Sequence, residues 1–343
     1  MRGVKIDKTY VINLKHRKDR WQQINKNFEG TGLTLTKWDA ISGKDLPDNY
    51  IKKVTTDFCY HLCSPGLIGC WLSHYTLWNH LVKQNEKNVL ILEDDAFPTA
   101  HFNQRVDQIL NDIPSNYDFV YFGCTGSCNP QINQLFHFWT GNSNQEIYIG
   151  NLKLGQLIYP IYPLATHAYL ISNKGAKKLL NNKNMGKIFN HIDYTLATYI
   201  YQKTHKNDLN TFIMMAVNPP LINQGFAIDS EIAPPLHPIF SAPLSKMKIL
   251  NTFSGDYLSN VQIAYIRKLS FPITLLFVII VLISFILGLW FSNRVIVCYL
   301  SFLVVIYLME TIMTKNYRLM LFEMLTILII TLSSYYKIRA LTK

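Results

Sequence analysis

The clearest pattern in the sequence is an apolar run that ends in acidic residues. Val89 to Leu92 is wholly aliphatic, and Glu93, Asp94 and Asp95 follow it directly. Such a run predicts a strand buried on both faces of a mostly parallel sheet. Ligands bind beyond the carboxyl ends of strands in such sheets, so this stretch predicts a divalent-cation site. A solvated acidic turn is the alternative.

Alternation along an extended chain separates these three carboxylates. Glu93 and Asp95 are expected on one side, where they converge on a metal directly or through water, and Asp94 on the other.

Apolar periodicity predicts further elements on both sides of this strand. Strands are expected at 10–14, 33–41, 117–123, 166–172 and 212–217, and helices at 65–86, 102–113, 173–180 and 191–203. The polar stretch 127–155 has weak periodicity and is expected to be a mobile loop. Alternating strands and helices predict an α/β domain.

The helix predicted at 65–86 begins with Ser64 as its N-cap. It has an apolar stripe that is expected to face the core: Trp71, Tyr75, Trp78 and Val82. A second face carries small residues, which predict a close approach by a ligand or by the sheet: Gly66, Gly69 and Ser73. His74, beside them, is interpreted either as a phosphate or ribose ligand or as a structural residue.

A basic turn follows the first predicted strand. Arg17 and Arg20 are three residues apart, share a helix face, and suit a phosphate or nucleotide. A solvated basic turn is the alternative. Asp39 ends the second predicted strand, where it could accept hydrogen bonds from a base or ribose, or cap a turn.

Charge and cysteine content narrow the classes of function. The formal net charge is +11, but the lysines are scattered and no basic block carries interleaved aromatic residues, so nucleic-acid binding is not expected. The chain has six cysteines, two pairs of which have C-x3-C spacing: Cys59, Cys63, Cys70, Cys124, Cys128 and Cys298. Free reduced thiols of a cytosolic domain are expected, with a four-cysteine zinc site as the alternative.

The C-terminal third differs from the rest. Residues 271–291 contain no charge and are long enough to span a bilayer, and 295–313 and 319–336 are further candidate spans. Glu310 and Glu323 lie within these two spans and are expected to face a partner helix. Arg267 and Lys268 precede the first span and favour a cytoplasmic domain before it. A hydrophobic hairpin in the membrane interface is the alternative.

Several motifs together resemble glycosyltransferase family 25, which includes lipopolysaccharide galactosyltransferases and relatives of procollagen galactosyltransferases. The motifs are YVINLKHRKDR, SPGLIGCWLSHYTLW, VLILEDDA, THAYLISNKGAKKLL and HIDY, within residues 9–232. The resemblance implies a GT-A fold, which is a Rossmann-like α/β domain. It also implies an inverting transfer from a nucleotide sugar, UDP-galactose or UDP-glucose, with Mn²⁺ or Mg²⁺ on the diphosphate.

The resemblance also implies roles for individual residues. The nucleotide and its phosphates would lie near Asn13, Arg17, Arg20, Asp39, Ser73, His74 and Asp94. Glu93 and Asp95 would hold the metal. Asp193, in the HIDY motif, matches an acceptor-side acid and is interpreted as the base that takes the proton of the attacking hydroxyl.

We therefore expect a membrane-anchored glycosyltransferase acting on a lipid-linked or lipopolysaccharide-type glycan. A GT-A domain is expected at 1–235, a proline-containing linker at 236–270 and a membrane region at 271–343. Two other classes of protein use similar features: a metal-dependent phosphohydrolase or nucleotidyltransferase, and an inactive membrane scaffold.

Overall fold

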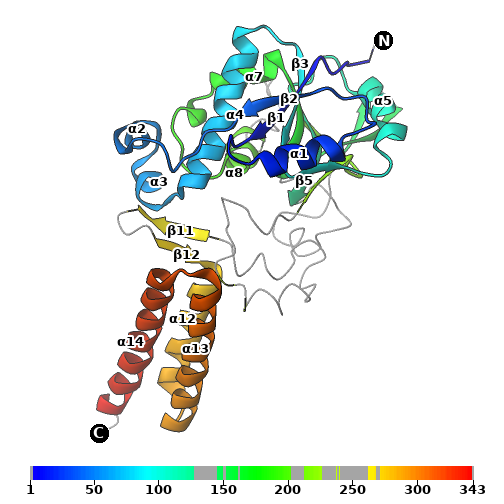
Figure 1. Cartoon of the computed structure of the whole chain (residues 1–343). Coiled ribbons are helices and arrows are strands. Elements are labelled where there is room, and N and C mark those ends of the chain that lie inside the picture. Colours follow the sequence, from blue (N-terminus) through cyan, green and yellow to red (C-terminus); the bar gives the residue numbers. More distant parts are fainter. Residues whose placement is uncertain are drawn as a thin grey trace. The chain divides into compact units, whose positions relative to one another are not determined.

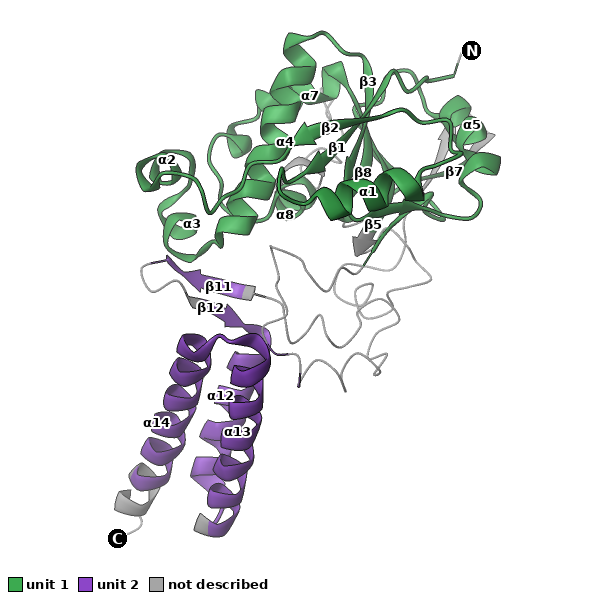
Figure 2. Ribbon diagram, viewed as in Figure 1, with its two compact units in different colours: residues 1–227 green, residues 228–343 purple. Residues whose placement is uncertain are grey.

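The chain divides into two compact units, residues 1–227 and 228–343 (Figure 2). The structure is a computed structural model, and it describes residues 3–126, 145–149, 152–160, 163–201, 212–225, 237, 239, 262–267 and 271–341.

The first unit is built on a mixed eight-stranded sheet (Figure 1). In spatial order its strands are β2 (Leu35–Asp39), β1 (Lys8–Asn13), β3 (Asn88–Glu93), β8 (Pro163–Ser172), β5 (Phe119–Gly126), β9 (Met214–Val217), β7 (Leu152–Tyr159) and β6 (Gln145–Ile149). β1 pairs in parallel with both β2 and β3, whereas β8 is antiparallel to β3 and to β5. A small antiparallel pair, β4 (Ala96–Pro98) and β10 (Ile222–Gln224), follows the acidic stretch.

Helices cover both faces of this sheet. They are α1 (Lys18–Asn27), α2 (Asp48–Val54), α3 (Asp57–Leu62), α4 (Pro65–Lys83), α5 (Phe102–Asp112), α7 (Asn173–Leu180) and α8 (Ile192–Thr195), which continues as a π-helical segment, Leu196–Tyr201. In β3, Val89 and Ile91 enter the core beneath α4 and α7, whereas Leu90 and Leu92 enter the core beneath α1 and α5. All four side chains are fully buried, which confirms a strand covered on both faces.

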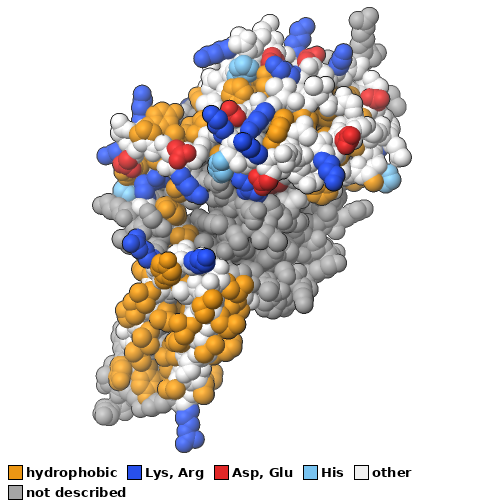
Figure 3. Space-filling view, viewed as in Figure 1, with side chains coloured by type: hydrophobic (Ala, Val, Ile, Leu, Met, Phe, Trp, Pro, Cys, Tyr) orange, Lys and Arg blue, Asp and Glu red, His pale blue; other side chains and the backbone are white. Residues whose placement is uncertain are grey.

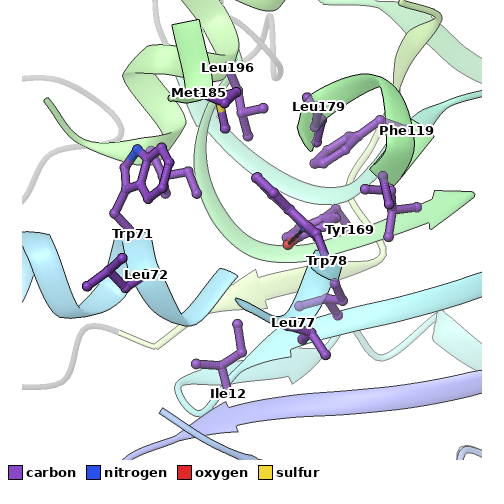
Figure 4. Packing of buried hydrophobic residues seen from close by; sticks show 14 of the residues in the cluster. Ile12, Trp71, Leu72, Leu77, Trp78, Phe119, Tyr169, Leu179, Met185 and Leu196 are labelled. Atoms are coloured by element: carbon purple, nitrogen blue, oxygen red, sulfur yellow. Dashed lines mark hydrogen bonds between the residues drawn. The ribbon is translucent and has the colours of Figure 1, made fainter. Parts of the chain in front are cut away.

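Helix α4 confirms the predicted start and the predicted stripe. The Ser64 side chain accepts a hydrogen bond from the Leu67 backbone N–H at 3.2 Å, so it is the N-cap. Trp71 and Trp78 are buried in the core between α4 and the sheet (Figure 4). A Cβ at Gly69 would lie 2.4 Å from the Ile41 carbonyl oxygen, so the close approach is made by the loop after β2.

The predicted loop at 127–155 is wrong in its second half. β6 and the first part of β7 fall inside it, and they form one edge of the sheet. Edge strands face solvent on one side, and their polar residues weaken the alternation that identifies a strand. Residues 127–144 lie outside the described residues.

The expectation of free thiols is wrong for Cys59 and Cys63, which form a disulfide with an S–S distance of 2.17 Å. Cys59 lies in α3 and Cys63 is its C-cap residue, so the C-x3-C spacing places the two sulfurs one helical turn apart. Cys124 is also disulfide-bonded, whereas Cys70 and Cys298 are free.

The second unit contains a hairpin of β11 (Gln262–Ile266) and β12 (Phe271–Thr274), followed by α12 (Leu275–Trp290), α13 (Asn293–Thr314) and α14 (Tyr317–Leu341). Apolar side chains cover the visible surface of these helices, whereas charged side chains gather on the first unit (Figure 3). By length and composition alone, α13 and α14 could each cross a membrane.

The first predicted span, 271–291, is not helical throughout. Its first four residues form β12, and the Thr274 side chain caps α12 by accepting a hydrogen bond from the Phe277 backbone N–H at 3.1 Å. The expectation that the acidic residues face a partner helix is confirmed for Glu323 of α14, which accepts a hydrogen bond from the Tyr307 hydroxyl of α13 at 3.0 Å. Glu310 is also buried, and its carboxylate accepts a hydrogen bond from the Ile239 backbone N–H.

Candidate active site

The carboxyl ends of three parallel strands meet at the acidic stretch. In the sheet register Asn13 of β1 lies opposite Asp39 of β2, and Ile12 lies opposite Glu93 of β3. Polar side chains from all three strands therefore collect at the sheet edge where α/β proteins bind ligands.

Asp94 is tied to the neighbouring strand and helix. One of its oxygens accepts a hydrogen bond from Asn13 Nδ2 at 2.7 Å, and the other forms an ion pair with the Arg20 guanidinium at 2.8 Å. The Asn13 amide also donates to the Arg17 carbonyl oxygen. Asp94 thus fixes the end of β3 to the turn that starts α1.

Glu93 points to the opposite face of the sheet, toward α4, as alternation along β3 requires. Its Oε1 accepts hydrogen bonds from the Thr166 hydroxyl at 2.7 Å and lies 3.2 Å from His74 Nε2. Burial opposes ionisation, but the hydrogen bonds from His74 and from the Thr166 hydroxyl together lower the pKa of Glu93. Glu93 is therefore held as a carboxylate.

Asp95 has one oxygen available for a ligand. Its Oδ2 accepts a hydrogen bond from Gln224 Nε2 at 3.1 Å, whereas its buried Oδ1 has no hydrogen-bond partner in the described part of the chain. Burial and the charges of Glu93 and Asp94 raise the pKa of Asp95 to about 7. A buried carboxylate oxygen beside two further carboxylates fits a divalent cation, which would offset their repulsion.

Cys70 lies close to the acidic stretch, beside Glu93. Burial raises the pKa of its thiol, and the charges of Glu93, Asp193 and Asp95 raise it further. The ligand atoms of Cys70, His74 and Glu93 all lie within 4.8 Å of one another, so these three residues could also hold a metal ion. The charges of the acidic stretch and of Asp193 thus both act on the Cys70 thiol.

Asp193 lies in the first turn of α8. Its Oδ2 accepts a hydrogen bond from the Ala165 backbone N–H at 2.9 Å, and its Oδ1 accepts one from the Tyr194 backbone N–H at 2.7 Å. Ala165 has a φ of 65°, a left-handed conformation that is strained for a residue with a Cβ. The hydrogen bond that orients the Asp193 carboxylate therefore comes from a residue with a strained backbone.

The other predicted nucleotide-binding residues differ in exposure. Asp39 is the most open, with 66% of its side chain exposed. Arg17 forms a bidentate pair with Asp19 at the exposed start of α1, from Nε to Oδ1 and from Nη2 to Oδ2. Ser73 and His74 are fully buried. Ser73 accepts a hydrogen bond from the Ile41 backbone N–H and donates one to the Gly69 carbonyl oxygen, so its described contacts hold the loop after β2 against α4.

Sequence reasoning missed Cys70, Thr166 and Gln224. Cys70 precedes His74 by four residues, and this helical spacing was the available signal. Thr166 and Gln224 reach the site from β8 and β10, which no local pattern connects to the acidic stretch.

Comparison with known proteins supports a relation to glycosyltransferases. The family model described as Glycosyltransferase family 25 (LPS biosynthesis protein) matches residues 6–196. A Glycosyltransferase 25 family member of Aedes aegypti is 32% identical over 189 residues, which cover 52% of this chain and 28% of the relative. Procollagen galactosyltransferase 1-B of Xenopus laevis is 28% identical over 193 residues, which cover 53% of this chain and 29% of the relative.

A further relative is named as an inactive member of the family. Inactive glycosyltransferase 25 family member 3 of Mus musculus is 24% identical over 193 residues, which cover 53% of this chain and 30% of the relative. In each of these three relatives the match spans less than a third of that protein's length.

Proposed function

Because the chain belongs to glycosyltransferase family 25, we propose that it is an inverting GT-A enzyme that transfers a hexose from a nucleotide sugar to a glycan hydroxyl. The observation that carries this proposal is the meeting of Asn13, Asp39 and the acidic stretch at the ends of three parallel strands. Galactose from UDP-galactose is the proposed transfer, with UDP-glucose as the second donor, because one relative is named a procollagen galactosyltransferase.

A divalent cation, Mn²⁺ or Mg²⁺, fits the residues at the end of β3. Asp95 would hold it through its available Oδ1, together with Glu93. When bound, such an ion offsets the charge that develops on a diphosphate leaving group. Arg20 and Asn13 hold Asp94 and so keep this end of the strand in place.

Asp193 is the proposed general base. Two backbone N–H groups fix its carboxylate, which leaves lone pairs on both oxygens to accept a proton from the attacking hydroxyl. Asp193 accepts a hydrogen bond from Ala165 and Glu93 accepts one from Thr166, the next residue of β8, which supports a base beside the donor site.

A membrane anchor would place this site beside a lipid-linked or lipopolysaccharide-type acceptor and raise the local concentration of that acceptor. Arg267 and Lys268, before β12, favour a cytoplasmic first unit. The Cys59–Cys63 disulfide favours an oxidising compartment instead. Both cysteines are buried, so they are alkylated after the protein is denatured in acid-quenched cells. Free thiols would support the cytoplasmic placement, and disulfide-bonded cysteines would overturn it.

Titration calorimetry on the purified chain tests the proposed activity. A panel of nucleotide sugars is titrated with Mn²⁺ and then with a chelator, and one sugar nucleotide is expected to bind only with the metal. Glu93→Ala and Asp95→Ala should abolish that binding, whereas Asp107→Ala, an exposed carboxylate of α5, should not. Absence of binding by the folded chain across the panel would instead support an inactive scaffold.

A further inference from the structure

A buried chain of side chains leads from the core to the Glu93 carboxylate. Trp78 Nε1 lies 2.9 Å from the Tyr169 hydroxyl, that hydroxyl lies 2.8 Å from His74 Nδ1, and His74 Nε2 lies 3.2 Å from Glu93 Oε1. Trp78, Tyr169 and His74 are all fully buried. Trp78 and Tyr169 lie beside each other in the core above the sheet (Figure 4).

The direction of these hydrogen bonds follows from the donors available. An indole N–H can only donate, so the Tyr169 oxygen accepts from Trp78. The tyrosine has a single proton, which it donates to His74 Nδ1. His74 then carries its own proton on Nε2 and donates it to Glu93.

The opposite arrangement leaves a proton without an acceptor. If His74 carried a proton on Nδ1, the Tyr169 oxygen would receive two N–H groups. The tyrosine proton would then have no acceptor among the contacts described for this hydroxyl. A buried donor without an acceptor is costly, so the first arrangement is favoured.

From this geometry, and resting on the metal site of the proposed function, we propose that Trp78, Tyr169 and His74 are positioning residues for Glu93. With the Thr166 hydroxyl, His74 occupies Oε1 and fixes the rotamer of the carboxylate. Tyr169 is itself held by stacking on Phe119, at 4.4 Å between ring centroids and an interplanar angle of 12°. The chain thus links the position of the carboxylate to the rigid core.

The fold provides a matched control for Tyr169. Tyr121 lies opposite it in the β5–β8 register and is equally buried, but its hydroxyl has no hydrogen-bond partner in the described part of the chain. Tyr169→Phe and Tyr121→Phe therefore each remove one hydroxyl from the same core, and only the first removes a member of the chain.

Two measurements on the full chain test the proposal. In histidine-labelled protein, the ¹⁵N resonances of His74, assigned by their loss in His74→Gln, should show a proton on Nε2 and none on Nδ1. Tyr169→Phe should release this preference, and Tyr121→Phe should keep it. Mn²⁺ affinity should fall about 10–100-fold in Tyr169→Phe, the range for hydrogen-bond partners of metal ligands, and stay unchanged in Tyr121→Phe.

Three results would overturn the proposal: a proton on Nδ1 of the unmodified chain, equal Mn²⁺ affinities of the two tyrosine variants, or a thiolate-to-metal absorption band on adding Co²⁺. The last would make Cys70 a direct ligand of the metal. If the expected Nε2 proton is found but Mn²⁺ does not bind, the hydrogen-bond chain stands and the proposed metal dependence fails.

Discussion

The three adjacent carboxylates at the end of β3 lie in three different environments. Asp94 is neutralised by Arg20, Glu93 is held by His74 and Thr166, and Asp95 keeps one buried oxygen without a hydrogen bond. Desolvation costs most where no partner compensates it. Of these three carboxylates, Asp95 is therefore the one whose ionisation opposes folding most strongly when no metal is bound.

This difference predicts how the stability of the metal-free chain depends on pH. The pKa of Asp95 is about 7 in the folded state and about 3.9 in an unfolded chain. The folded state thus holds an extra proton between these values, and the stabilisation that Asp95 contributes is lost as pH rises toward 7. Asp95→Asn removes this loss. The free energy of unfolding of the variant minus that of the unmodified chain should therefore be more positive at pH 8 than at pH 5.

Urea unfolding of both proteins with chelator, at pH 5 and pH 8, measures this difference. The pKa of Glu93 is lowered, so its stabilisation is lost only as pH falls through the acid range below this window. An equal stability difference at the two pH values would contradict the environment assigned to Asp95.

Asp193 gives the second prediction at this scale. Asp193→Asn keeps the shape of the side chain but removes the base, so turnover should fall by roughly 10²–10⁴-fold. Metal-dependent donor binding should persist, because Asp193 is not among the residues proposed to hold the donor. Initial rates and calorimetric donor affinity measure the two effects, and thermal unfolding confirms that the variant is folded. Unchanged turnover would remove Asp193 from the role of base.

Sequence alone predicted that Glu93 and Asp94 point to different sides, because period-two alternation is a local property of a strand. Asp95 lies in the turn after β3, where this alternation does not apply. Glu93 indeed contacts α4 and Asp94 contacts α1. The partners of these carboxylates were not predictable, because Thr166 and Gln224 approach from strands far along the chain. His74 was singled out, but only the fold shows that it bonds Tyr169 and Glu93 rather than facing solvent.

At the scale of elements, the packing of α4 against the loop after β2 sets the shape of one side of the site. Ser73 bonds the Ile41 backbone N–H, and a Cβ at Gly69 would meet backbone atoms of both Ile41 and Gly43, at 2.4 and 2.7 Å. These neighbours are main chain and cannot rotate away, so the contact depends on glycine.

Gly69→Ala should therefore destabilise the chain by about 1–3 kcal/mol, which is typical of overpacking. Alanine is favoured over glycine inside a helix by about 1 kcal/mol, so helix propensity alone predicts the opposite sign. Gly186→Ala is the control, since its Cβ would meet only the Lys183 carbonyl oxygen at 3.3 Å. Denaturant unfolding measures the stability of both variants. If Gly69→Ala is more stable than the unmodified chain, the loop after β2 can move to make room for the added Cβ.

Elements with strong local signals were predictable. α4 and α7 begin where the sequence predicts, and α7 also ends there. α2 and α3 were missed because each is only two turns or fewer and too short to show periodicity. β6 and β7 were missed because the place of a strand at the end of a sheet is set by the whole sheet and not by the strand's own residues.

At the scale of the whole molecule, the three C-terminal helices share one bundle. Phe277 near the start of α12 packs on Phe322 near the start of α14, at 6.3 Å between ring centroids. Further along, a Cβ at Gly288 would lie 2.7 Å from the Thr331 carbonyl oxygen. Between these two contacts, α12 and α14 run side by side in the same direction. If α14 crosses a membrane, α12 therefore crosses it as well.

We accordingly predict three crossings. α12 has 16 residues, or about 24 Å of helix. The four residues of β12, three of them apolar, add roughly 13 Å of extended chain, and the total exceeds the ~30 Å of a hydrocarbon core. A reporter fused after Lys343 should lie on the opposite side of the membrane from a tag at residue 1, and a reporter at Lys315, between α13 and α14, on the same side as that tag. If instead the reporter after Lys343 shares the side of the tag and the one at Lys315 does not, only α13 and α14 cross.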